Sequence, residues 1–209
     1  MWKRNGLSLV LLVLTVVFIV GQAVAGHHVH NEELTQHGRA PIDLWHYLET
    51  GHFVSATFEN WESEFLQMGM YVLLTVSLRQ HGSAESRPLD PAREQSRVEP
   101  GPTPWPVKRG GIWKVLYGHS LAIAFGLLFL LSFTLHALGS WRAEQAEKLL
   151  QGLPAPGFLQ HLASSTFSMQ NWQSEFLAVL SLVVLTIFLR QKDSPQSKPV
   201  EAPHAQTGD

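Results

Sequence analysis

The sequence predicts an all-α integral membrane protein with four transmembrane helices, built as two tandem two-span repeats with short outer surface helices. Three observations lead to this fold class. Apolar residues gather in four long blocks, two of the blocks begin with nearly the same polar motif, and Lys and Arg concentrate in alternate connecting segments. Such charge asymmetry is typical of multi-pass membrane proteins.

The four apolar blocks have two different lengths. A helix that crosses the hydrocarbon core needs roughly 20 mostly apolar residues, since the core is about 30 Å thick. The first and third blocks come close to that length by themselves, whereas the other two reach it only when counted from Asn60 to Arg79 and from Asn171 to Arg190. Their polar lead-ins are therefore expected at membrane depth or at its interface. The blocks are residues 7–25, 65–78, 121–138 and 176–189.

The second half of the chain repeats the first. Residues 60–66 read NWESEFL and residues 171–177 read NWQSEFL, with His52 and His161 at matching upstream positions. Because each repeat holds two spans, both copies have the same orientation and should be related by a pseudo-two-fold axis along the membrane normal. The predicted division is a first repeat at 1–82, a linker at 83–111, a second repeat at 112–192 and a tail at 193–209.

Charge sets the predicted orientation. With four spans and a cytoplasmic N-terminus, only Arg39, Arg142 and Lys148 of the 15 Lys and Arg residues fall outside. The positive-inside rule therefore places both termini in the cytoplasm. The first block ends in Ala23-Val24-Ala25, which is typical of a signal-peptidase site. Its alignment with the third block, which cannot be a signal peptide, favours a retained helix instead.

The segments between the blocks differ in character. The outer loop at 26–59 carries six histidines and, after Pro41, an amphipathic stretch at 42–50 that predicts a short surface helix ending at Gly51. The linker and the tail are rich in proline and poor in apolar residues, so both are expected to be disordered and cytoplasmic.

The repeated motif has a simple structural interpretation. Asn60 and Asn171 suit helix N-caps, and glutamates in the first turn complement the helix dipole. However, Glu62 becomes Gln173 while Glu64 returns as Glu175, and retention of one particular carboxylate suggests a fixed partner. The predicted polar cluster around the axis contains Asn60, Ser63, Glu64, Asn171, Ser174, Glu175, His52 and His161.

The same cluster contains weak candidates for metal ligands. His52, His161, Glu64 and Glu175 would suit divalent Zn, Fe, Mn, Ni or Cu, although hydrogen bonding at helix ends explains these residues more simply. The chain has no cysteine, which excludes thiolate ligands and nucleophiles. His136, in the third block, fits either an interhelical hydrogen bond or a polar cavity, and both interpretations stay open.

A longer motif carries a resemblance to a known family. Residues 56–68 read ATFENWESEFLQM, with NGLSL at 5–9 before it and GSAES at 82–86 after it. This pattern resembles an uncharacterised family of small bacterial integral-membrane proteins that is classed as a domain of unknown function. The resemblance covers nearly the whole chain. It implies a location in the bacterial cytoplasmic membrane and implies no activity.

Three functions are compatible with these features. The first is a non-enzymatic structural or accessory role, with the lipid bilayer and a membrane protein or a second copy as partners. The second is a small transporter or an ion or proton pathway that uses Glu64 and Glu175. The third, ranked last, is a metal-dependent membrane enzyme. The net charge of −2 gives no reason to expect nucleic-acid binding, and no nucleotide-binding, serine-hydrolase or zinc-protease fingerprint occurs.

Overall fold

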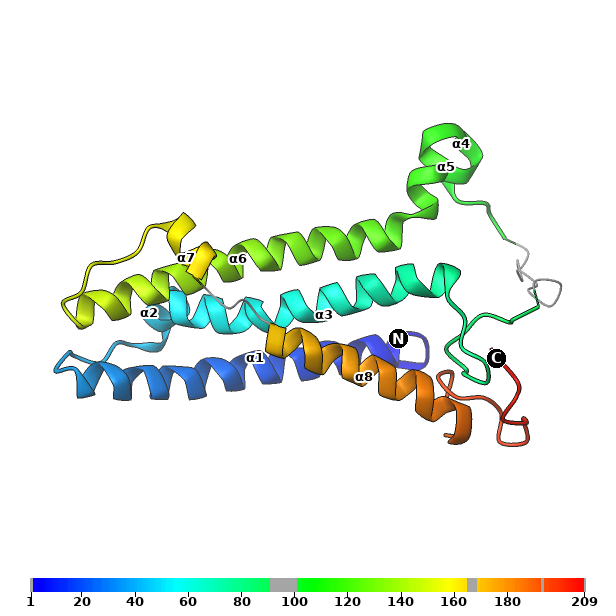
Figure 1. Cartoon of the computed structure of the whole chain (residues 1–209), viewed down its shortest axis with the longest axis horizontal. Helices are drawn as coiled ribbons and strands as arrows, with labels where there is room; N and C mark the ends of the chain where they lie inside the picture. The colour runs from blue at the N-terminus through cyan, green and yellow to red at the C-terminus, as the bar shows by residue number, and fades with distance from the viewer. Residues whose placement is uncertain (1, 91–100, 165–168, 193, 209) are drawn as a thin grey trace. The chain divides into compact units, whose positions relative to one another are not determined.

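The computed structural model describes residues 2–90, 101–164, 169–192 and 194–208. Their regular structure consists of helices, with no strand in these ranges, so the predicted all-α class is confirmed (Figure 1). The helices are α1 Trp2–Gln36, α2 Leu44–Leu48, α3 Gly51–Ser77, α4 Trp105–Arg109, α5 Gly111–Gly118, α6 Ser120–Leu150, α7 Phe158–Ser164 and α8 Met169–Phe188.

Two of the described helices, rather than the predicted four, are long and apolar enough to cross a membrane. They are Arg4–Gln36, which is most of α1, and α6 at Ser120–Leu150. α3 has the length, but Glu59, Glu62 and Glu64 in its first half lower its hydropathy. The apolar part of α8 covers only Gln173–Phe188, which is shorter than the roughly 20 residues that a span needs.

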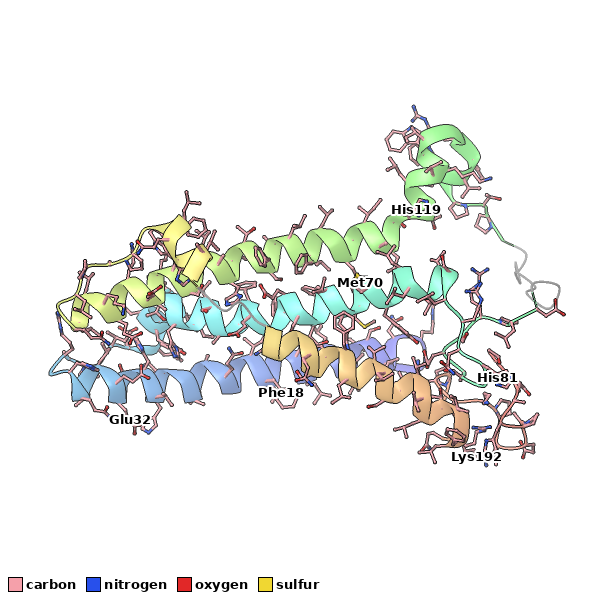
Figure 2. All side chains as sticks on the ribbon, in the orientation of Figure 1. Phe18, Glu32, Met70, His81, His119 and Lys192 are labelled. Carbon is pink, nitrogen blue, oxygen red and sulfur yellow. The ribbon has the colours of Figure 1, made fainter. Side chains whose placement is uncertain are left out.

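Both apolar helices leave most of their side chains uncovered. In their most apolar stretches, 6% of α1 and 17% of α6 is buried within the protein. Phe18, labelled in Figure 2, is 69% exposed and Leu127 is 63% exposed. Contiguous apolar surface of this kind marks a contact with lipid or with another protein.

The chain divides into two compact units. Unit 1 comprises Met1–Glu62 with Leu131–Phe167, and unit 2 comprises Ser63–Leu130 with Ser168–Asp209. Each unit therefore combines residues from both predicted repeats, and the repeat boundaries at 1–82 and 112–192 stay a prediction. The tandem repeat stays a prediction from the sequence.

In unit 1, α3 and α6 touch through their backbones. A Cβ atom on Gly51 would lie 2.5 Å from the carbonyl oxygen of Gly139 and 2.6 Å from the backbone nitrogen of Ala143. A Cβ on Gly139 would lie 2.6 Å from the backbone nitrogen of Ser55. Each helix thus presents two small residues four positions apart, the pattern that lets membrane helices approach closely.

The first helix packs on the same unit through side chains. The Gln22 amide donates to the Thr57 hydroxyl at 3.2 Å. Ala23 is buried, and the Tyr47 hydroxyl lies against Gly26, where a Cβ would collide with it. The buried ring of Tyr47 therefore needs glycine at position 26.

The predicted short helix after Pro41 is present as α2. Asp43 caps it, since its carboxylate accepts a bond from the His46 backbone N–H at 3.0 Å. That bond and a second one from the His46 side chain lower the pKa of Asp43. The expected end at Gly51 is wrong by two residues: Glu49 is the C-cap, and Gly51 begins α3, where its close contact with α6 explains the glycine.

The described part of the linker is not wholly irregular. α4 begins after Pro104 and contains Pro106 in its first turn, a favourable place for proline. The Arg109 guanidinium carbon lies 5.4 and 5.2 Å from the ring centroids of Trp105 and Trp113. This cation–π contact stabilises α4 against α5.

In unit 2, the tail folds back onto the end of α3. Lys198 is buried, and its ammonium group donates to the carbonyl oxygens of Gly82, His204 and Gln206. These bonds join the tail to the segment that follows α3.

Candidate functional site

A carboxylate–imidazole pair is buried in unit 1. Glu62 Oε2 lies 3.0 Å from His136 Nδ1. The Glu62 side chain is 0% exposed and that of His136 is 7% exposed. The second oxygen of Glu62, Oε1, has no hydrogen-bond partner among the described residues. Burial of an ionisable pair is costly unless its geometry and remaining hydrogen bonds compensate, so the unbonded oxygen is informative.

Local sequence explains how α6 presents His136 to α3. Ser132, His136, Gly139 and Ala143 follow at spacings of four, three and four, which places them on one helical face. This face is small and polar, while the remainder of the helix is rich in Leu, Ile and Phe. Gly139 lies one turn from His136, so the close backbone approach brings the imidazole within reach of α3.

The sequence alone does not predict this pair. His136 was open between an interhelical hydrogen bond and a polar cavity, and the structure shows the bond. Glu62 is not part of the predicted cluster, because the second repeat has Gln173 at the matching position. The useful signal was different: each member of the pair is an ionisable residue inside a predicted membrane span, and such residues usually have a partner.

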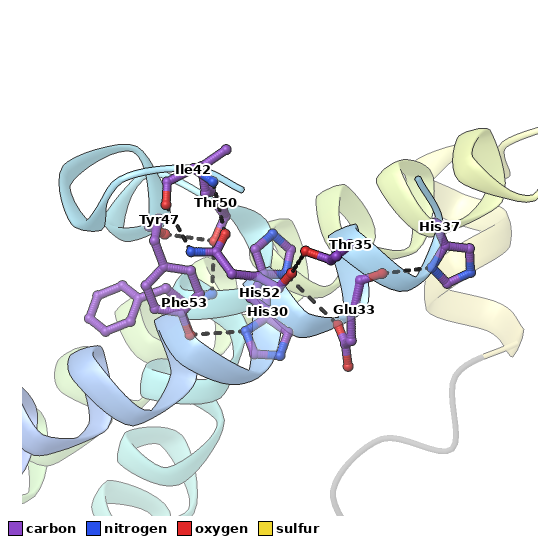
Figure 3. Close-up of polar contacts among 10 residues, drawn as sticks. His30, Glu33, Thr35, His37, Ile42, Tyr47, Thr50, His52 and Phe53 are labelled. Carbon is purple, nitrogen blue, oxygen red and sulfur yellow. Dashed lines mark hydrogen bonds and ion pairs between the residues drawn. The ribbon is translucent and has the colours of Figure 1, made fainter. Parts of the chain in front are cut away.

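His52 and His161 have separate surroundings in unit 1. His52 Nδ1 lies 3.0 Å from the Tyr47 hydroxyl, and its ring stacks on His30 with centroids 5.3 Å apart (Figure 3). His161 bonds to Glu144 through Nδ1 at 2.5 Å and to Ser140 through Nε2 at 2.9 Å. Each histidine therefore joins the start of a helix to the C-terminal part of a neighbouring apolar helix.

The Tyr47 ring packs against two histidines near the end of α1. Its ring centroid lies 5.8 Å from that of His27 and 5.6 Å from that of His30. Burial, and secondarily the negative charge of Glu33, raise the pKa of Tyr47, so the hydroxyl stays protonated at neutral pH. A protonated hydroxyl can donate to His52.

Glu64 and Glu175 both belong to unit 2. The Gln67 amide donates to the backbone carbonyl oxygen of Glu175 at 2.6 Å. The two carboxylates are near enough to interact electrostatically. Glu64 is exposed, Glu175 is half-buried, and Ser63 is buried whereas Ser174 is exposed.

The other members of the predicted cluster are placed as follows. Asn60 lies in unit 1 and is exposed, with its amide donating to the Ala56 carbonyl at 3.3 Å. The Asn171 side chain falls outside the described residues. No group of three or more His, Asp or Glu residues in the described part of the chain is arranged to hold a metal ion. The structure therefore adds no support to the metal hypothesis.

The proximity of Glu64 and Glu175 makes a testable prediction. Because the like charges repel each other, Glu64→Gln and Glu175→Gln should each stabilise the protein by up to about 0.5 kcal/mol. The double variant should gain little beyond either single one, since one substitution already removes the repulsion. Unfolding of detergent-purified protein measures this, and Glu175→Gln combined with the tail variant Glu201→Gln is the additive control. Additive losses in the Glu64/Glu175 cycle would contradict the expected repulsion.

The fold and the buried pair define an all-helical protein with two span-length apolar helices and an ionisable pair between α3 and α6 of unit 1. A family model, Domain of unknown function (DUF6766), matches residues 1–209. The chain belongs to this family, as the motif resemblance indicated. No curated protein and no solved structure matches the chain.

Proposed function

We propose that this chain is a multi-pass protein of the bacterial cytoplasmic membrane and that it forms a proton-linked pathway through the Glu62–His136 pair. One observation carries the proposal: a fully buried carboxylate bonds to an imidazole on an apolar, span-length helix. Ionisable residues at membrane depth are expensive to keep, and they commonly mark proton or ion pathways.

Burial on α3 supports four spans instead of two. Its polar residues Thr57, Glu62 and Gln67 are buried, whereas Leu73 and Val76 are exposed by 53% and 57%. The average hydropathy of α3 treats those polar side chains as exposed to lipid, although other residues of the protein cover them. α3 and α8, taken with their polar lead-ins, then serve as the second and fourth spans, with both termini in the cytoplasm.

The buried Glu62–His136 pair also helps to choose between a structural role and a proton-linked role. A structural or accessory role needs only packed helices, and a buried ion pair is often no more stabilising than apolar residues of similar volume. A proton-linked role needs a group that changes charge near physiological pH, and histidine is the usual one. The buried pair therefore favours the second sequence hypothesis over the first, with Glu62 and His136 in place of Glu64 and Glu175.

Proton flux into liposomes tests the proposal. Purified protein is reconstituted with a pH-sensitive dye inside the vesicles, and a potassium gradient with valinomycin drives proton entry. We expect the wild-type protein to acidify the interior and Glu62→Gln and His136→Gln to lose that flux. Glu32→Gln, an exposed residue labelled in Figure 2, is the matched control. Equal flux in wild type, Glu62→Gln and empty vesicles would leave the accessory role as the better explanation.

Single-cysteine labelling tests the orientation. The chain contains no cysteine, so each probe reports without background. Thr35→Cys should react with an impermeant thiol reagent in intact cells whose outer membrane has been permeabilised, and His81→Cys should react only after lysis. Both positions are exposed, whereas the neighbouring Ser83 is 0% exposed and would resist labelling on either side. The opposite labelling pattern would overturn the topology proposed from the Lys and Arg distribution.

A further inference from the structure

A pocket of about 500 Å³ lies at the C-terminal end of α1, within unit 1. Three helices meet there: the last two turns of α1, the start of α3 and the last turns of α6. Figure 3 shows some of its lining residues, with His30 and His52 close together and Glu33 between them and His37 along α1. The lining residues are His30, Glu33, Leu34, His37, Thr50, Gly51, His52, Ala143, Ala146, Glu147, Leu150 and Gln151.

The charged side chains that line this pocket are negative, and the Gln151 amide donates to the Glu147 carboxylate at 3.0 Å. The lining contains the carboxylates of Glu33 and Glu147 and three imidazoles, and none of the described lining residues is Lys or Arg. His30 Nδ1 is buried without a hydrogen-bond partner and lies 3.8 Å from Glu33 Oε2, too far for a hydrogen bond. A buried nitrogen of this kind normally has a partner.

The remaining wall of the pocket is apolar. Leu34, Ala143, Ala146 and Leu150 contribute it from α1 and α6. The neutral aromatic ring of Tyr47 stands behind His30, with their centroids 5.6 Å apart. A ligand that fits both walls has one donor-rich cationic end and one short apolar end.

We propose that this pocket binds a small primary ammonium ion that carries a short apolar tail. A primary ammonium has three N–H donors, and the pocket presents two carboxylates as acceptors. The unbonded His30 Nδ1 accepts as well when the imidazole carries its proton on Nε2. A carboxylate ligand would instead meet Glu33 and Glu147 as like charges. A metal ion is disfavoured because the described His and Glu residues form no group of three with metal-ligand spacing.

This inference goes beyond the proton-linked function and does not depend on it. The pocket residues and the pair residues form separate sets, since neither Glu62 nor His136 lines the pocket. Binding can therefore be present in a protein that carries no protons, and proton flux can persist in a protein whose pocket is blocked.

Calorimetric titration with n-butylammonium tests the proposal. The full-length protein is placed in nanodiscs at about pH 8, where histidine with its ordinary pKa of about 6.5 is neutral. We expect saturable binding of butylammonium and no saturable binding of butanol or butyrate. Each methylene added from methylammonium to butylammonium should tighten binding about fourfold, the equivalent of about 0.8 kcal/mol of apolar burial.

Two kinds of variant locate the site. Glu33→Gln/Glu147→Gln should weaken butylammonium binding at least about tenfold, because charge-assisted hydrogen bonds are lost. Ala146→Phe should also abolish binding by filling the pocket without changing charge. Glu32→Gln is the matched control, since Glu32 is adjacent to Glu33 but pairs with His28 outside the pocket. Thermal unfolding confirms that each variant is folded.

The lipid composition of the nanodiscs distinguishes two sources of the ammonium group. If the ligand is a lipid headgroup, phosphatidylethanolamine discs should weaken butylammonium binding through competition, compared with phosphatidylglycerol discs. If the ligand is a free amine, both discs should give the same affinity. The proposal is overturned by the absence of saturable butylammonium binding in both discs, or by equal binding in the Glu33/Glu147 and Ala146 variants and the control.

Discussion

Replacing His136 with leucine is expected to destabilise the protein by about 3–5 kcal/mol. The substitution removes the hydrogen-bond partner of Glu62 Oε2, and Oε1 has none among the described residues. The fully buried carboxylate of Glu62 would then have no hydrogen-bond partner among the described residues on either oxygen. Breaking a buried pair by removing one partner is strongly destabilising for this reason. Chemical unfolding of the purified protein in mixed micelles measures the loss.

The double variant Glu62→Leu/His136→Leu supplies the decisive comparison. It removes both charges and replaces them with apolar side chains, an exchange that is often neutral or stabilising by 1–4 kcal/mol. We therefore expect the double variant to be more stable than His136→Leu alone. His119→Leu, at an exposed histidine, should change stability by less than about 0.5 kcal/mol. Glu62→Leu, measured alone, completes the cycle. If the losses of Glu62→Leu and His136→Leu simply add in the double variant, the residues do not act as a pair.

Replacing Gly139 with leucine is expected to cost about 3 kcal/mol, the upper part of the range for overpacked sites. Its Cβ would lie 2.6 Å from the Ser55 backbone nitrogen and 3.0 Å from a Val54 methyl group. Because the obstacle is backbone, rotation of a neighbouring side chain cannot relieve the collision. α3 and α6 would have to separate, and the buried pair would lose its geometry. Chemical unfolding and proton flux measure the two consequences.

Gly126→Leu is the matched control on the same helix. Nothing lies within 4 Å of a Cβ at this position, so the larger side chain meets no obstacle. Leucine also has a higher helix propensity than glycine, which is worth up to about 1 kcal/mol. We expect Gly126→Leu to be neutral or slightly stabilising. A similar loss at positions 126 and 139 would show that the α3–α6 contact is not the cause.

Hydrophobic patterning predicted the helices well and their lateral contacts poorly. The first and third apolar blocks became α1 and α6, because a helix satisfies the backbone hydrogen bonds of a long apolar run within the run itself. The short helix after Pro41 was predictable from Asp43 and the amphipathic stretch that follows it. Periodicity describes one helix at a time, so it could not tell which face of α6 meets α3.

The contact between Glu62 and His136 could not be predicted from the repeat either. The repeat directed attention to Glu64 and Glu175, because both copies retain them. Glu62 and His136 occur once each, and their partnership joins residues 74 positions apart in sequence. Comparing the two repeats cannot reveal such a pair, because neither residue recurs in the other repeat. The packing role of the glycines at 51 and 139 was not predicted, since a small residue has no visible contact until the neighbouring backbone is known.

The glycine contact between α3 and α6 also determines which parts of unit 1 can move. Where backbones touch directly, there is no layer of side chains to deform, so sliding or rotation of one helix against the other meets hard repulsion at once. α1 meets α3 through the Gln22 and Thr57 side chains, which can exchange rotamers at little cost. The α3–α6 crossing is therefore the contact in unit 1 that least tolerates sliding or rotation of its helices.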